Sequence, residues 1–102
     1  MSNWTKLPDC QDILPQNGRV IIVHEKPVAI FNIDGKYAAM DNRCPHRGGS
    51  LGDGALEGKV VTCPWHGWQF NCRTGEAVEN EAVVVRTYPL ENRQKGLYIK
   101  ID

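Results

Sequence analysis

The sequence predicts an all-β fold, and three observations support this prediction. Glycine and proline divide the 102 residues into short segments, and the segments between them are rich in β-branched residues. No window longer than ten residues keeps the 3.6-residue hydrophobic period of a helix without interruption. At most a short helical turn is expected, at residues 10–14. The length fits one domain over residues 1–102, which buries roughly 60–65% of the surface that its unfolded chain exposes.

The expected strands follow one another with short connections. They lie at residues 19–23, 27–33, 36–40, 82–88 and 96–101. The turn pair Asn17-Gly18 precedes the first strand. Asp34-Gly35 is a strong two-residue hairpin signal, so the second and third strands are expected to pair antiparallel.

The stretch from about residue 41 to residue 75 differs from both flanks. It holds seven of the ten glycines, three of the four cysteines and two of the three histidines. Glycine clusters favour loops over regular strands. We therefore expect a small, loop-rich metal-binding subdomain, inserted into a β-scaffold that the two terminal segments form.

Charge and hydropathy exclude several classes of protein. Lys plus Arg and Asp plus Glu both number 12, so no basic field would attract nucleic acid. The first 25 residues lack a secretory signal, and the longest apolar run, residues 20–23, is too short to span a bilayer. The expected location is cytoplasmic, without a membrane partner. Disulfides are not expected there, although the chain has four cysteines.

Two short motifs carry the chemistry of this chain. They are Cys44-Pro45-His46 and Cys63-Pro64-Trp65-His66, with sixteen residues between them. Each sets a thiol beside an imidazole, so together they offer two sulfur and two nitrogen ligands to a metal. The proline after each cysteine restricts the loop backbone. Three glycines are expected to let backbone N–H groups approach the sulfur atoms, namely Gly48, Gly49 and Gly67.

The ligand types alone leave two metals open. A single zinc ion accepts two cysteines and two histidines, but its usual layout separates a cysteine pair from a histidine pair. Here each loop supplies one of each. A [2Fe–2S] cluster accepts the same four residues and carries electrons. Zinc would instead make the chain a stabilised interaction module.

The two motifs and their surroundings closely resemble the cluster-binding boxes of Rieske iron–sulfur proteins. The first box reads Cys44-Pro45-His46-Arg47-Gly48-Gly49-Ser50-Leu51, and the second reads Cys63-Pro64-Trp65-His66-Gly67-Trp68-Gln69-Phe70. The likeness covers nearly the whole chain. It implies an antiparallel β-sandwich or barrel scaffold and one [2Fe–2S] cluster per chain. Cys44 and Cys63 would then ligate a buried iron, and His46 and His66 would ligate the other iron, near the surface.

The boxes also indicate a branch of this family. Rieske proteins of quinol-oxidising complexes have an additional cysteine in each box, where this chain has Gly49 and Trp65. They also place hydroxyl groups near the cluster, where this chain has Trp68 and Phe70. Each absence removes stabilisation of the reduced state. The chain therefore resembles a soluble Rieske-type ferredoxin with a reduction potential near the low end of the range for the family.

The resemblance implies a function. Such ferredoxins carry single electrons from a flavin-dependent reductase to a terminal oxygenase, so we expect a monomeric electron-transfer protein that is not itself an enzyme. The alternative is the Rieske-like small subunit of an NAD(P)H-dependent nitrite reductase, whose partner would be the large subunit. A zinc-stabilised interaction module is the third possibility.

Several other residues have simpler expected roles. Cys10, Cys72 and His24 are not expected to be ligands, and Trp68 is expected to pack against the fold. Trp65 either contacts an electron-transfer partner or covers the cluster, and Arg47 is either a solvated charge or an attraction for an acidic partner.

Overall fold

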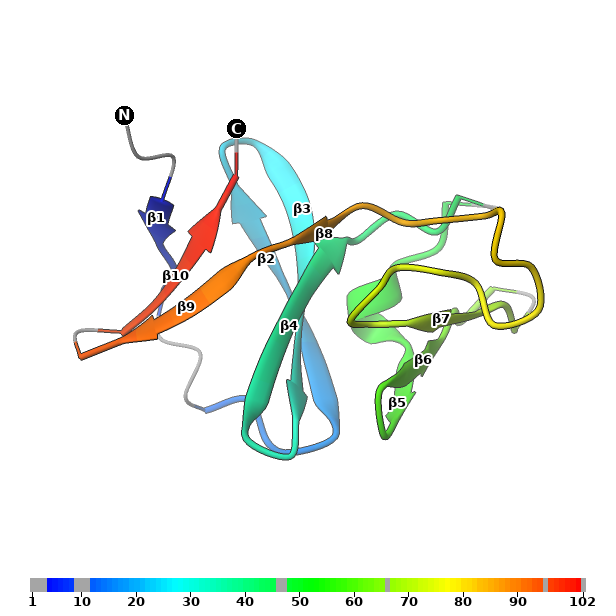
Figure 1. The fold of residues 1–102 in the computed structure, drawn as a ribbon, viewed down its shortest axis with the longest axis horizontal. Coiled ribbons are helices and arrows are strands. Elements are labelled where there is room, and N and C mark those ends of the chain that lie inside the picture. The colour runs from blue at the N-terminus through cyan, green and yellow to red at the C-terminus, as the bar shows by residue number, and fades with distance from the viewer. Residues whose placement is uncertain (1–3, 9–11, 46–47, 66, 95, 102) are drawn as a thin grey trace.

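The computed structural model describes residues 4–8, 12–45, 48–65, 67–94 and 96–101. The described residues form ten β-strands and one 3₁₀ turn, without an α-helix (Figure 1). All strand pairs within the three sheets are antiparallel. The all-β prediction is confirmed.

The central sheet has the strand order β2-β3-β4-β8. Its strands are β2 (Asn17–Val23), β3 (Lys26–Ile33), β4 (Lys36–Asp41) and β8 (Thr87–Tyr88). Asp34 and Gly35 connect β3 to β4 with φ angles of 53° and 92°, which are the left-handed values that a type I′ hairpin turn requires. The predicted hairpin is therefore confirmed.

Side chains of the central sheet alternate between two hydrophobic clusters. On β3, Val28 and Ile30 belong to one cluster, whereas Ala29 and Phe31 belong to the other. All four side chains are fully buried. Because successive residues of a strand point to opposite faces, the sheet has a core on both sides.

Two smaller sheets cover these two faces. The first has the strand order β1-β10-β9 and consists of β1 (Trp4–Lys6), β9 (Leu90–Arg93) and β10 (Gly96–Lys100). The second has the strand order β5-β6-β7 and consists of β5 (Ala55–Glu57), β6 (Val60–Thr62) and β7 (Gln69–Asn71). Figure 1 shows them on either side of the central strands. Ile99 packs in the cluster of Val28, and Phe70 packs in the cluster of Phe31.

Two expected features of the scaffold are wrong. Asn17 and Gly18 begin β2 and do not form a turn. Gly18 lies against the Phe31 ring, where an added Cβ would be 2.7 Å from two ring carbons, so glycine is needed here for close packing. Of the strand expected at residues 82–88, only Thr87–Tyr88 is a strand. Upstream of it, Val85 N donates to Gly75 O at 2.8 Å, so the backbone pairs with a loop instead of a sheet.

The stretch over residues 41–75 is more regular than expected. It contains β5, β6 and β7 as well as a 3₁₀ turn at Leu51–Asp53. The short β-branched run of β6 is a signal that composition alone did not reveal. Of the helical turn expected at residues 10–14, residues 12–14 are described, and they form a turn and a bend.

Candidate metal centre

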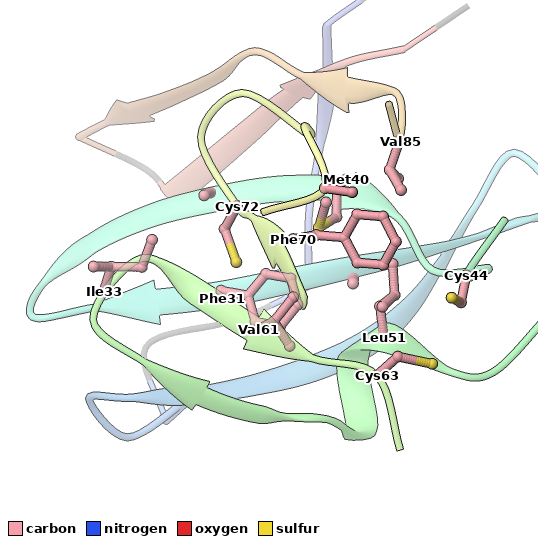
Figure 2. Packing of buried hydrophobic residues seen from close by; sticks show 13 residues of the cluster. Phe31, Ile33, Met40, Cys44, Leu51, Val61, Cys63, Phe70, Cys72 and Val85 are labelled. Atoms are coloured by element: carbon pink, nitrogen blue, oxygen red, sulfur yellow. The ribbon is translucent and has the colours of Figure 1, made fainter. Parts of the chain in front are cut away.

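The two predicted cysteine ligands come from different parts of the fold. Cys44 follows the end of β4, and Cys63 follows β6 directly. Their exposed fractions are 0% and 1%, and both are free thiols. Figure 2 shows the two sulfur atoms at the same end of the hydrophobic cluster, beyond Leu51. The fold thus brings together two thiols that are far apart in the sequence.

The surroundings of Cys63 are unfavourable for an isolated thiolate. Burial raises the pKa of the Cys63 thiol, and the neighbouring Cys44 thiol raises it further. The backbone N–H of Trp65 hydrogen-bonds to the sulfur of Cys63 and opposes this rise. Because thiolates are the form that binds metals, two adjacent buried thiols of this kind suit a cation that compensates their charge.

The first ligand loop is closed at its base. Arg43 and Ser50 form an isolated antiparallel bridge. Cys44 N donates to Gly49 O at 2.9 Å, and Gly48 N donates to Cys44 O at 2.7 Å. These bonds curl the chain tightly around Cys44.

The side chain of Asn42 strengthens this closure. Its Nδ2 donates to Ser50 Oγ at 2.9 Å, and its Oδ1 accepts from Gly52 N at 2.7 Å. Sequence reasoning missed this residue. Its only sequence signal is an amide side chain two positions before the first ligand.

The second ligand loop lies against the first. Cys63 N donates to Trp68 O at 2.7 Å, which closes the loop over the segment between them. A Cβ added to Gly49 would lie 2.8 Å from Cys63 Sγ and 3.3 Å from Trp65 Cβ. Gly49 therefore leaves the space in which the sulfur of the other loop sits.

The expected role of the glycines as donors toward cluster sulfur stays a prediction. The backbone N–H of Trp65 bonds to the Cys63 sulfur, whereas the N–H of Gly48 bonds to the carbonyl oxygen of Cys44. Gly67 adopts a φ of 73°, with nothing within 4 Å of an added Cβ. This positive φ is a backbone conformation that glycine adopts easily.

The two predicted histidine ligands, His46 and His66, lie outside the described residues, as do Arg47 and Cys10. Their assignment stays a prediction from the sequence.

The other residues singled out in the sequence have the following positions. Trp68 is half-buried against the core, with its ring centroid 6.3 Å from that of Phe70, so its packing role is confirmed. Trp65 is 56% exposed.

The exposed His24 is hydrogen-bonded through Nε2 to Thr5 Oγ1 at 3.0 Å. Cys72 is buried in the hydrophobic cluster, and burial raises the pKa of its thiol to about 12.

Comparison with known protein families decides between the two metals. Residues 3–89 match the Rieske [2Fe-2S] domain family. The chain belongs to this family. The cofactor of such a domain is a [2Fe–2S] cluster, which replaces zinc as the interpretation of the site. The described residues fit this group, because they provide two adjacent buried thiols, an amide donor to sulfur and a cradle that an added Cβ at Gly49 would fill.

Two characterised relatives are ferredoxins. The Rieske chain is 30% identical over 102 residues to the ferredoxin component of the naphthalene 1,2-dioxygenase/salicylate 5-hydroxylase systems of Ralstonia sp, covering 98% of this chain and 97% of the relative. It is 34% identical over 91 residues to the ferredoxin subunit of 3-phenylpropionate/cinnamic acid dioxygenase from Photorhabdus laumondii, covering 87% of each.

Solved structures show the same fold. A chain in the complex of reduced oxygenase and oxidised ferredoxin of carbazole 1,9a-dioxygenase matches with a TM-score of 0.85 and 27% identity, covering 98% of this chain and 94% of that one. A crystal structure described as the small subunit of an NADPH nitrite reductase matches with a TM-score of 0.81 and 20% identity, covering 94% of this chain and 96% of that one, which shows a shared fold. In the described part of the chain, no helix has the length and hydropathy needed to cross a bilayer.

Proposed function

We propose that this Rieske protein is a one-electron carrier, which passes electrons from a flavin-dependent reductase to a terminal oxygenase. The observation that carries this proposal is the buried pair of thiols, Cys44 and Cys63, held side by side by two loops. Its relatives are ferredoxin components of dioxygenase systems over nearly their full length. We propose Cys44, His46, Cys63 and His66 as the four ligands.

The described residues would hold and shield the cluster. Cys44 and Cys63 would ligate one iron, and the Trp65 N–H would donate to the Cys63 sulfur. Leu51 and Phe70, both fully buried, pack beside the two cysteines and keep water from that side. When bound, a [2Fe–2S] cluster with mixed cysteine and histidine ligands supplies a one-electron couple between roughly −150 and +300 mV.

Four positions around the ligands support a potential near the low end of that range. Gly49 and Trp65 provide no thiol for a disulfide between the loops, and Trp68 and Phe70 provide no hydroxyl donors. Fewer donors to the cluster leave the added electron less stabilised. We therefore propose the low-potential ferredoxin branch.

The architecture of the carrier is part of the same proposal. We propose that residues 41–75 act as a cluster-binding subdomain, because they contain both ligand motifs and the β5-β6-β7 sheet. The carrier would act as a monomer, and it would make and break no substrate bond itself.

A second candidate function keeps the same chemistry but changes the partner. The fold shared with a nitrite reductase small subunit favours a role as a small subunit fixed to a larger reductase. Stable co-purification with a flavin- and sirohaem-containing protein would support it. A carrier that purifies alone and shuttles between two proteins would contradict it.

Cyclic voltammetry of the purified holo-protein tests the main proposal. We expect a reversible one-electron wave in the lower part of the Rieske range, together with the visible absorbance of an iron–sulfur cluster. A strongly positive potential would contradict the low-potential branch. A colourless protein that binds stoichiometric zinc and gives no wave would overturn the electron-carrier function.

A further inference from the structure

A hollow of about 650 Å³ opens beside the first ligand loop. Two of its lining residues come from the central sheet, namely Lys26 at the start of β3 and Asp41 at the end of β4. The first ligand loop contributes Arg43 and Ser50, and the second contributes Trp65. The hollow therefore borders both candidate ligand loops. It is large enough for a side chain or two of another protein.

The charges of the hollow are unbalanced. Lys26 and Arg43 are both exposed, and within the described part of the chain neither forms a salt bridge. The single carboxylate in the lining, that of Asp41, accepts a hydrogen bond from the Tyr88 hydroxyl group. The lining therefore carries two positive charges and one negative charge, and the negative group already accepts a hydrogen bond from Tyr88. The whole chain, by contrast, carries no net charge.

The aromatic wall of the hollow is joined directly to the candidate metal centre. Trp65 is 56% exposed, and its backbone N–H bonds to the Cys63 sulfur. An added Cβ on Gly49 would lie 3.3 Å from Trp65 Cγ, so the side chain stands on the first ligand loop. A group bound in the hollow is therefore held beside the centre itself.

We propose that this hollow receives an acidic side chain of the redox partner protein, while an apolar side chain of that partner packs on Trp65. The inference rests on the proposed electron-carrier function and names the chemistry of its partner. Trp and Arg are enriched among residues that dominate protein–protein binding, and complementary charge raises association rates at low salt. Because the chain has no net charge, this attraction is local and not a property of the whole protein.

Electron transfer to a defined acidic acceptor tests the proposal. Reduced holo-protein is mixed with cytochrome b5, an acidic one-electron acceptor, in a stopped-flow instrument at low and high ionic strength. The double variant Lys26→Glu/Arg43→Glu should slow the bimolecular reaction about tenfold at low salt and much less at high salt. Trp65→Ala should slow it at both salt concentrations, because the lost contact is apolar.

A matched control separates local charge from net charge. Lys36→Glu/Lys59→Glu makes the same change in net charge at two exposed residues that do not line the hollow. We expect less than a twofold effect from this control. Equal slowing by the two double variants would overturn the proposal. Lys26→Glu alone, which leaves the ligand loop unchanged, should slow the reaction about threefold.

Two further measurements distinguish the remaining outcomes. Saturation of the hollow by micromolar succinate, without any effect of the variants on the cytochrome b5 reaction, would assign it to small carboxylates and overturn the proposal. Voltammetry of every variant tests the electron-carrier function independently of docking. A normal one-electron wave with no specific effect of the hollow residues would reject only the docking inference, whereas no wave in the unchanged protein would reject the carrier function.

Discussion

Asn42 Nδ2 donates a hydrogen bond to Ser50 Oγ at 2.9 Å, across the base of the first ligand loop. Asn42 Oδ1 accepts from Gly52 N at 2.7 Å, so one amide side chain joins both ends of the loop that contains Cys44. Asn42 therefore closes the loop from a position outside the four proposed ligands.

Asn42→Ala should destabilise this loop. It removes two hydrogen bonds of a partly buried group, so we expect the free energy of unfolding to fall by about 1–3 kcal/mol. Loss of the cluster absorbance under mild denaturant should be faster. The control is Asn42→Asp, which keeps an acceptor for Gly52 N and an acceptor for the Ser50 hydroxyl. Equal cluster lifetimes for the alanine variant and the wild type would show that the loop is closed without Asn42.

Gly49→Ala should impair cluster incorporation. The added Cβ would lie 2.8 Å from Cys63 Sγ, which is closer than atoms pack, so the two ligand loops must separate. The measurement is iron content and visible absorbance after reconstitution. Gly58→Ala is the control, because its added Cβ meets open space and only the positive φ of 60° is strained. It should cost about 1 kcal/mol of stability and leave the iron content unchanged. Full iron content in Gly49→Ala would show that the loops tolerate the separation.

Cys72 should make stability depend on alkaline pH. Burial raises the pKa of its thiol from 9.0 to about 12, against the opposing effects of the Val61 backbone N–H and the Arg73 charge. Between these values the folded state retains a proton that the unfolded state has lost. Stability should therefore decrease as pH rises through this window, by up to about 1.4 kcal/mol per pH unit from this group.

Denaturant unfolding at several pH values between 9 and 12 measures this effect. The Cys72→Ala variant, which has no thiol to titrate, should show a shallower decrease than the wild type. Parallel decreases in the two proteins would mean that Cys72 ionises without unfolding.

Substitution of the proposed ligands should distinguish residues needed to bind the cluster from residues that set its reduction potential. His66→Cys should retain a cluster, because thiolate is also an iron ligand. The added negative charge should lower the reduction potential by on the order of 100 mV, as measured by voltammetry. Cys63→Ser should lose the cluster and much of the stability that it provides. A His66→Cys protein with an unchanged potential would contradict the ligand assignment.

Local sequence patterns were sufficient for several features. Asp34-Gly35 specified a hairpin because few residue pairs adopt two successive left-handed conformations easily. The β-branched segments specified β2, β3 and β10, and the two cysteine–histidine motifs specified the family. These features depend on a few adjacent residues, so reading along the chain reveals them.

Other features depend on contacts between distant segments. Gly18 reads as a turn residue but lies in a strand, because the Phe31 ring fills the space beside it. The sequence pattern predicts a strand at residues 83–85, but the backbone of this segment pairs with the loop at residues 75–77. The closure by Asn42 joins residues eight and ten positions apart. The Trp65 donor depends on how the second loop curls back to Cys63. Neither has a signature in the residue types alone.

The sequence by itself determined the all-β class and the family, and it predicted the ligand types, because each is encoded by residue identity and short spacing. Only the tertiary structure decided that Cys44 and Cys63 lie adjacent and buried, and that Lys26, Arg43 and Trp65 surround one hollow beside them. Such proximity arises when three sheets pack on two shared cores and bring the ends of β4 and β6 together. That packing buries apolar side chains from elements far apart in the sequence, so no local segment specifies it.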